Sequence, residues 1–263
     1  MRAWRFDRFG PYREVLHLVN AVTAPPEAQE CRVRMRAIGL NFPDVLLVEG
    51  KYQLKPELPA TPGMEGMGEV VEAGPGSRYR PGQRVLVNLL NGTFAEEVTV
   101  SDAFLLPVPD GMSDGQAAAF HVTYQTSHLA LLHRGQLKAG ETLLVHGGAG
   151  GVGTAAIQLG RAFGAKVIAT ATGALKCQVA KRCGADETID LSTEDFVARV
   201  KTLTGGRGVD VVYDPVGGEL FDKSLKVLAL ESRLLVIGFT SGTNPSVPVN
   251  RLLLKNASVI NVQ

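Results

Sequence analysis

The segment that decides the fold runs from Glu141 to Gly160 and reads ETLLVHGGAGGVGTAAIQLG. It begins as an apolar strand, continues through a glycine-rich turn and ends as a helix rich in alanine. Gly148, Gly150 and Gly153 have the G-x-G-x-x-G spacing of a dinucleotide-binding turn. Because the strand before the turn and the helix after it are both present, the segment predicts dinucleotide binding.

Each glycine of this motif has an expected task. The first allows the tight reversal from strand to helix, the second lets the backbone approach a pyrophosphate, and the third lets the helix pack close to the strand. The N-terminus of the helix adds unpaired N–H groups and the positive end of a dipole, which favour phosphate binding.

Composition narrows the class of protein. The chain has 263 residues, 45% of them hydrophobic and 20% charged, and it contains 30 glycines, which is typical of a soluble α/β protein. A net charge of +1 does not favour nucleic acid as a partner. The N-terminus carries charges where a signal peptide needs an apolar core, and no apolar run has the length of a membrane span. We therefore expect a cytoplasmic protein without a membrane partner.

The three cysteines, Cys31, Cys177 and Cys183, have spacings that form no CxxC pair. Neither a disulfide framework nor a structural zinc site is indicated, so we interpret them as reduced packing residues.

The two halves of the chain have different patterns, which predict a domain over residues 1–122 and another over 123–263. In the first half, short β-like runs alternate with Gly/Pro turns, as in small barrels and sandwiches. These runs are residues 31–38, 69–73, 84–88, 95–100 and 105–108. The proline-rich stretch 55–62 is interpreted as a surface loop.

In the second half, near-continuous apolar strands alternate with amphipathic helices, which indicates a parallel sheet covered on both faces. We expect strands at 143–145, 166–171, 187–190, 209–213, 234–237 and 257–262. We expect helices at 151–163 and 175–183, a helix capped by Ser192 that stops near Gly205, and a helix at 220–229. The carboxyl ends of the strands then bring the glycine turn, 170–172, 214–217 and 238–239 to one edge of the sheet, where ligands bind.

The end of the second strand indicates which dinucleotide is bound. NAD-selective turns place an acid there, which accepts a hydrogen bond from the ribose 2′-hydroxyl. Residues 168–176 contain no acid, whereas Thr172 and Lys176 can bind a 2′-phosphate. The pattern favours NADPH, although Lys176 can also be read as a solvated lysine on a helix face.

Several further motifs, in order along the chain, carry a family resemblance. They are GLNFPD at 39–44 with GKY at 50–52, LPATPGMEG at 58–66, the glycine turn, GGRGVDVVYD at 205–214 and LLLKN at 252–256. With these the chain resembles the quinone oxidoreductase (zeta-crystallin-like) family of the medium-chain dehydrogenase/reductase superfamily. The resemblance covers essentially the whole sequence. It implies a GroES-like β-barrel-type domain followed by a Rossmann doubly wound parallel sheet.

The resemblance also bears on metal chemistry. Zinc alcohol dehydrogenases, which are related to this family, place a zinc-binding Cys near the position of Asn41 and a zinc-binding His at that of Met64. Asn and Met are not usual zinc ligands, so no metal site is expected. Without that Lewis acid, hydride delivery to an electrophilic quinone or conjugated carbonyl is favoured over alcohol oxidation.

The resemblance further implies particular site residues. Asn41, Tyr52 and Thr126 would lie near the nicotinamide and the acceptor, and the first two can donate hydrogen bonds to a carbonyl oxygen. From the residues alone, Asn41 can also be a loop residue that satisfies its own backbone, and Tyr52 a surface aromatic. The histidines are interpreted as structural. The expected cofactor contacts are Gly148, Ala149, Gly150, Gly151, Val152, Gly153, Thr172, Lys176, Val216, Gly217, Gly238 and Phe239.

This chain departs from the family pattern in three places. Leu191 stands where many relatives have a tyrosine that helps to hold the 2′-phosphate, and His121 and Gln125 stand where proline and glycine are common. Relatives also continue beyond the position of Gln263 and return to the first domain, so we expect the chain to be truncated relative to them. In the full-length form the resemblance implies a homodimer.

Three functions remain open at this point. The first is an NADPH-dependent reductase of a quinone or conjugated carbonyl. The second is an enoyl (thioester) reductase, and the third is an NADP(H)-binding protein without turnover. The glycine turn predicts cofactor binding under all three hypotheses and does not separate them.

Overall fold

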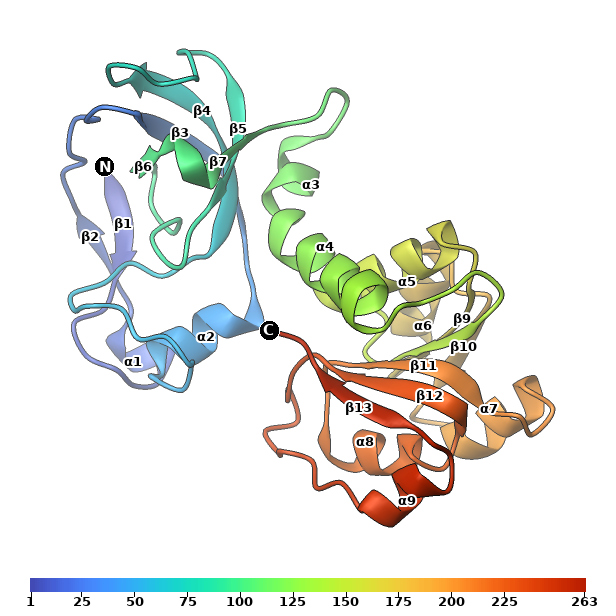
Figure 1. Ribbon diagram of the computed structural model, residues 1–263. Helices are drawn as coiled ribbons and strands as arrows, with labels where there is room; N and C mark the ends of the chain where they lie inside the picture. Colours follow the sequence, from blue (N-terminus) through green and yellow to red (C-terminus); the bar gives the residue numbers. More distant parts are fainter. The chain divides into compact units, whose positions relative to one another are not determined.

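A computed structural model describes residues 1–263, and the chain divides into two compact units, Met1–Val122 and Thr123–Gln263 (Figure 1). Each unit has its own sheet and its own hydrophobic core. None of the helices is both long and apolar enough to cross a membrane.

The first unit is built on a five-stranded antiparallel sheet with the strand order β6-β3-β4-β5-β7. Its strands are β3 (Glu30–Gly39), β4 (Glu65–Ala73), β5 (Arg84–Asn88), β6 (Glu97–Ser101) and β7 (Leu105–Pro107). A separate hairpin pairs β1 (Arg2–Arg5) with β2 (His17–Asn20). The helical segments are α1 (Tyr12–Val15), α2 (Phe42–Val48), a 3₁₀ turn (Asp102–Phe104) and α3 (Asp114–Ala118).

Alternation along these strands explains the core of the first unit. In β3, Cys31 and Val33 are buried while neighbouring arginines are more exposed, as expected for a strand with one face on the core. Cys31 is therefore a packing residue, as predicted, and all three cysteines are free thiols. A second, smaller cluster forms where α2 packs its Leu47 and Val48 against Phe6 and Met64. This cluster lies beside the Asn41 segment.

The second unit contains a six-stranded parallel sheet with the order β10-β9-β8-β11-β12-β13. The strands are β8 (Thr142–Val145), β9 (Lys166–Ala171), β10 (Glu187–Asp190), β11 (Val209–Asp214), β12 (Leu228–Val236) and β13 (Ser258–Asn261). The helices are α4 (His121–His128), which begins at the unit boundary, a π-helical turn (Leu129–Arg134), α5 (Gly151–Ala162), α6 (Ala174–Arg182), α7 (Phe196–Leu203), α8 (Gly218–Ser224) and α9 (Val249–Leu253).

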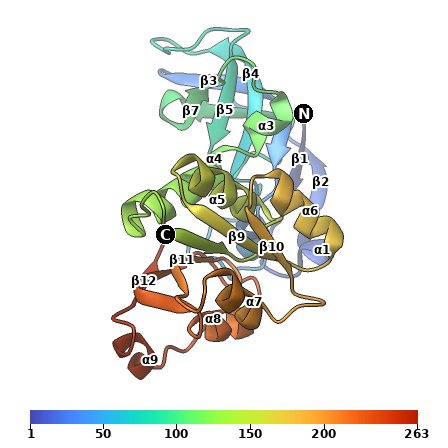
Figure 2. The ribbon, with the colours of Figure 1, turned by 90° about the vertical axis from the view of Figure 1, so that its right-hand side faces the viewer.

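Helices cover both faces of this sheet (Figures 1 and 2). One core cluster joins the sheet to α5 and α6 through residues such as Ile157 and Ala180. The other joins it to α7 and α8 through Phe196 and Phe221. All four residues of β8 are buried, which is why the strand reads as a continuous apolar run. The predicted α/β architecture is confirmed.

Two element predictions were wrong. The helix expected to be capped by Ser192 begins at Phe196, because Asp195 accepts from the backbone N–H groups of Val197 and Ala198. The Ser192 hydroxyl donates instead to Asp190.

The helix expected at 220–229 is α8, which ends at Ser224, while Leu228 already pairs with Val209 of β11 in the sheet. Strand pairing with a buried neighbour overrides the local apolar pattern there.

Candidate cofactor and active site

The glycine turn follows β8 directly and is fixed by its own backbone. Gly147 has a φ of +61°, so the left-handed residue of the turn lies just before Gly148, the glycine expected to allow the tight reversal. The N–H of Gly150 closes the turn by donating to the Gly147 carbonyl at 2.8 Å. The N–H of Gly148 donates to the carbonyl of Thr170 at 2.9 Å, which anchors the turn to β9.

Two glycines of the motif are required by packing. A Cβ on Gly153 would lie 2.2 Å from the carbonyl oxygen of Gly147, so α5 can approach the turn only if this residue lacks a side chain. A Cβ on Gly148 would lie 2.9 Å from the Cβ of Ala169 and 3.3 Å from that of Ala180. Close packing of the helix against the strand, which was predicted to require the third glycine, therefore requires the first glycine as well.

Gly150 is different, because the fold itself hardly requires a glycine there. Its φ of −82° and ψ of 169° suit any residue, it is exposed, and an added Cβ would meet only the Gly147 oxygen, at 3.3 Å. It caps the 12-residue helix α5 without a side chain, and the first turn of that helix carries no acid. The N-terminus of α5 is thus open to an anion that needs close approach to the backbone, which fits a dinucleotide pyrophosphate.

The loops after β11 and β12 form the next part of this sheet edge. Oδ1 of the buried Asp214 accepts from the N–H groups of Val216 and Gly217 at 2.8 and 3.0 Å. The loop after β12 is bonded to this one, since Ser241 N–H donates to the Val216 carbonyl. A Cβ on Gly217 would lie 3.1 Å from the Thr243 oxygen and 3.4 Å from the ring of Phe239.

These bonds bring the four predicted residues of the two loops together, namely Val216, Gly217, Gly238 and Phe239. A Cβ added to Gly147 would lie 3.6–3.7 Å from the side chains of Pro215 and Val216, so the loop after β11 borders the glycine turn.

His146 lies fully buried at the end of β8 and is part of a polar network under the turn. Its Nδ1 is 2.8 Å from the Thr170 hydroxyl, and its Nε2 is 2.7 Å from the Ser224 hydroxyl. Because Ser224 donates to the Leu220 carbonyl, it must accept from Nε2–H, and Thr170 then donates to Nδ1. Burial lowers the pKa of His146, so the ring is neutral. This geometry supports the structural role predicted for it.

Thr126 lies on α4 and is half-buried. The neighbouring Ser127 fixes the helix, since its hydroxyl donates to the Val152 carbonyl at 3.1 Å and is 2.9 Å from the Tyr213 hydroxyl. Both residues are completely buried, and burial raises the pKa of Tyr213. This contact ties α4 to the first turn of α5 and was not predicted.

Thr172 and Lys176 are both exposed where β9 leads into α6. Gly173 lies between them and caps α6, and its N–H donates to Oδ1 of Asp190 at 2.8 Å. The sequence reasoning did not include this aspartate, which ends the adjacent strand β10. Its position follows from the parallel pairing of β9 and β10, in which Asp190 lies opposite Ala171.

In the first unit, Asn41 caps α2 and is held by two carboxylates. Its side-chain Nδ2 donates to Oε1 of Glu65 at 2.9 Å, and its backbone N–H donates to Oδ2 of Asp44 at 2.8 Å. The second oxygen of Glu65 accepts from the N–H of Val122, also at 2.9 Å. Glu65 is 1% exposed and so holds the amide of Asn41 in one orientation. Asp44 thus pairs locally with the backbone at the start of α2.

Burial raises the pKa of Asp44 to about 6, and the charge of Glu65 adds to this effect. Tyr52 is half-buried against the small cluster that contains Leu47 and Met64. Met64 is itself buried in that cluster. No group of three or more His, Cys, Asp or Glu side chains is placed to hold a metal ion.

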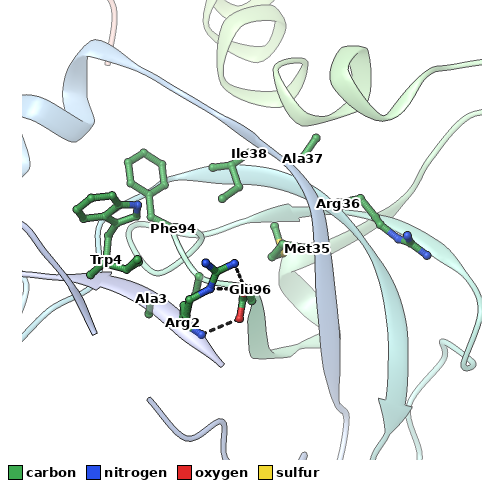
Figure 3. Close-up of a pocket in the computed structure, with 11 residues that line it drawn as sticks. Arg2, Ala3, Trp4, Met35, Arg36, Ala37, Ile38, Phe94 and Glu96 are labelled. Atoms are coloured by element: carbon green, nitrogen blue, oxygen red, sulfur yellow. Dashed lines mark hydrogen bonds and ion pairs between the residues drawn. The ribbon is translucent and has the colours of Figure 1, made fainter. Parts of the chain in front are cut away.

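A pocket of about 480 Å³ in the first unit lies apart from these residues (Figure 3). Trp4, Met35, Ile38 and Phe94 give it an apolar lining, and an ion pair between Arg2 and Glu96 crosses its edge. Neither Asn41 nor Tyr52 lines it.

Comparison with known proteins identifies the family. Residues 27–110 match the alcohol dehydrogenase GroES-like domain, and residues 151–263 match the zinc-binding dehydrogenase family. The quinone oxidoreductase-like protein 2 of Bos taurus is 41% identical over 261 residues, which cover 98% of this chain and 75% of the relative. The chain belongs to the quinone oxidoreductase-like proteins of the medium-chain dehydrogenase/reductase superfamily. The predicted family and its two-part fold are confirmed.

Solved structures of quinone oxidoreductases have the same fold as this chain. The quinone oxidoreductase of Pseudomonas syringae has a TM-score of 0.87 at 37% identity and covers 98% of this chain and 80% of its own. That of Escherichia coli, complexed with NADPH, has a TM-score of 0.86 at 33% identity with the same coverage. The chain spans 64–75% of the length of the curated quinone oxidoreductase-like relatives that it matches.

Proposed function

We propose that this protein is an NADPH-dependent oxidoreductase that transfers hydride to a quinone or a conjugated carbonyl compound. The observation that carries the proposal is Gly150, because its conformation and surroundings require no glycine while its place at the N-terminus of α5 suits a pyrophosphate. The membership in an oxidoreductase family and the NADPH complex of the Escherichia coli relative support it.

The second unit offers groups for each part of the cofactor. The N–H groups in the first turn of α5, from residues 151–153, would hold the pyrophosphate. Thr172 and Lys176, both exposed after β9, would bind the 2′-phosphate. The loops that contain Val216, Gly217, Gly238 and Phe239 would hold the nicotinamide end, since the first of them borders the same turn and the second is bonded to the first. When bound, the nicotinamide supplies the hydride.

The first unit offers groups for the acceptor. An acceptor carbonyl gains negative charge as hydride arrives, and a preorganised N–H donor stabilises that charge. The Asn41 amide has two N–H donors, and Glu65 uses one of them. The other can therefore serve an acceptor oxygen without reorientation of the side chain. Tyr52 is a further hydroxyl donor proposed for this task, and Thr126 of the second unit is proposed to lie near the nicotinamide.

We also propose that the reaction needs no zinc. The proposal rests on the chemistry of the side chains: Asn41 is an amide held by Glu65, and Met64 is a thioether buried among apolar side chains. Neither is a usual zinc ligand.

The test follows NADPH absorbance with 1,4-benzoquinone, 9,10-phenanthrenequinone and an enoyl thioester as separate acceptors, and with NADH in parallel. Quinone-dependent oxidation that survives a chelator, in protein shown by elemental analysis to lack zinc, is the expected result. Asn41→Ala should lower kcat by about 10²-fold, the cost typical of a lost oxyanion donor. Asn20→Ala, at an exposed asparagine of β2, is the control.

Each alternative gives a distinct result. Oxidation with the enoyl thioester alone would identify an enoyl reductase. Tight NADPH binding without oxidation of any acceptor would contradict the proposed activity and leave an NADP(H)-binding protein. Activity that disappears with the chelator and returns with zinc would contradict the zinc-independent reaction.

A further inference from the structure

Asp190 places a carboxylate at the part of the sheet edge proposed for the 2′-phosphate. It is the last residue of β10, it pairs in register with Ala171 of β9, and its Oδ1 accepts from Gly173 N–H at 2.8 Å. Gly173 caps α6, whose first turn carries Lys176. The carboxylate therefore lies within one hydrogen bond of the backbone that joins Thr172 to α6.

The hydrogen bonds of Asp190 keep it charged. Oδ1 accepts from the Ser192 hydroxyl at 2.6 Å, from the Ser192 N–H at 2.9 Å and from Gly173 N–H. These bonds, that of the Ser192 hydroxyl first, lower the pKa of Asp190. All of them use one oxygen, and no cation forms an ion pair with this carboxylate. The residue is half-buried, so Oδ2 remains available.

These features act in opposite ways on the two reduced cofactors. A carboxylate accepts a hydrogen bond from a ribose 2′-hydroxyl, as the acid at the end of the second strand does in NAD-selective proteins. The same carboxylate repels a 2′-phosphate, and it already occupies the Gly173 N–H that could otherwise bind one. Lys176 favours the phosphate. Lys176 and Asp190 thus place charges of opposite sign near this position, and Glu194 adds a second carboxylate, which accepts from the Asp190 N–H at 3.0 Å.

We infer that Asp190 is a specificity-determining residue, which replaces the acid missing from the end of β9 and lets the protein bind NADH as well as NADPH. The inference rests on the proposed nucleotide site. It goes beyond that site because it attributes the relative affinity for NADPH and NADH to the opposing charges of Asp190 and Lys176.

The test measures dissociation constants by titration of each reduced nucleotide, followed by its fluorescence, without any acceptor. Asp190→Asn keeps an acceptor oxygen for Gly173 N–H but removes the charge, so it should tighten NADPH about tenfold and change NADH less than threefold. Lys176→Met should weaken NADPH by a similar factor and leave NADH nearly unchanged.

Glu187→Gln is the matched control, because Glu187 lies at the opposite end of the same strand and its loss removes the same charge. It should change the ratio of the NADPH and NADH dissociation constants by less than twofold. Thermal unfolding of every variant checks the fold, and Asp190→Ser offers a second uncharged acceptor for Gly173 N–H if Asp190→Asn is unstable.

The outcomes separate this inference from the proposed function. If Asp190→Asn leaves the NADPH-to-NADH ratio unchanged, or weakens both nucleotides equally, the residue only holds Gly173 and the inference is overturned while the nucleotide site stands. If the unaltered protein binds neither nucleotide, the proposed function fails together with the inference.

Discussion

The glycine turn allows a test that separates what the fold needs from what a ligand needs. In Gly153→Ala the new methyl group would lie 2.2 Å from the Gly147 oxygen, 2.9 Å from the Gly147 carbonyl carbon and 3.0 Å from Cα of Gly148. All three are backbone atoms, so α5 and the turn must move apart. Overpacking of this kind costs about 1–3 kcal/mol. Replacing a helical glycine by alanine returns about 0.5–1 kcal/mol, which leaves a net loss of up to about 2.5 kcal/mol. Because the contacts are with backbone atoms, we expect the upper part of that range.

Gly150→Ala is the matched variant, with the same chemical change three residues away. Its φ and ψ suit alanine, and its one close contact, 3.3 Å from the Gly147 oxygen, requires a shift of only a few tenths of an ångström. Alanine is a poorer N-cap than glycine by about 0.5–1 kcal/mol, and the lower entropy of the unfolded chain returns about 0.4–1 kcal/mol. These two effects nearly cancel, so stability should change by no more than about 0.5 kcal/mol. The methyl group would occupy the surface proposed for the pyrophosphate, so NADPH should bind at least about tenfold more weakly, a loss of about 1.4 kcal/mol.

Urea unfolding followed by far-UV circular dichroism gives the stability of both variants, and titration of NADPH fluorescence gives their affinities. The expected pattern is a lower midpoint for Gly153→Ala and weaker binding with an unchanged midpoint for Gly150→Ala. Wild-type affinity in Gly150→Ala would refute the assignment of the pyrophosphate to the start of α5. Equal destabilisation of the two variants would refute the packing argument.

Three further predictions concern stability. The pKa of Asp44 is raised to about 6 from its ordinary value of 3.8, so its contribution to stability is present below pH 3.8 and is lost as the pH rises through 6. By pH 7.5 the buried charge costs about 3 kcal/mol, so the difference in free energy of unfolding between Asp44→Asn and wild type, from urea unfolding, should change by about 2.4 kcal/mol between pH 4 and 7.5. Parallel pH profiles would contradict the shift. Tyr213→Phe removes the hydrogen bond to Ser127 and should lower the free energy of unfolding by about 1 kcal/mol in the same assay. An unchanged free energy would argue against a stabilising link between α4 and β11. Asp195→Ala removes the cap of α7 and should cost about 1 kcal/mol of stability, whereas Ser192→Ala should cost much less. A larger loss for Ser192→Ala would instead support Ser192 as the cap, as predicted from the sequence.

The sequence predicts the second unit better than the first, for a physical reason. Parallel strands buried on both faces are continuous apolar runs, and the structure has strands within a few residues of each predicted one. The hairpin of β1 and β2 was missed because only Ala3 of β1 is buried, so that charged residues dominate its pattern. Helix α2 was missed because its seven residues are too few for a helical period and include Pro43.

The site shows a similar division. The glycine turn is local in sequence and was predicted with its spacing, whereas the partners that orient the other residues lie far along the chain. Glu65 is 24 residues from Asn41, and Ser224 is 78 residues from His146. Such pairs depend on strand order and on which face each residue takes. For Asp190 a signal was available, because consecutive parallel strands are often neighbours, and an acid at the end of the third strand therefore lies beside the end of the second.

The charges at the sheet edge limit how the nucleotide can be held. His146 is neutral and its two ring nitrogens are bonded to hydroxyl groups, so the residue under the turn adds no positive charge. The first turn of α5 contains neither acid nor base, and its contribution to phosphate binding is that of its N–H groups and dipole. The dipole acts on the pyrophosphate, which NADH and NADPH share. If the proposed nucleotide site is correct, we expect discrimination between them to depend on Lys176 and Asp190, which carry opposite charges. A change at either residue should then shift cofactor preference without loss of the common binding mode.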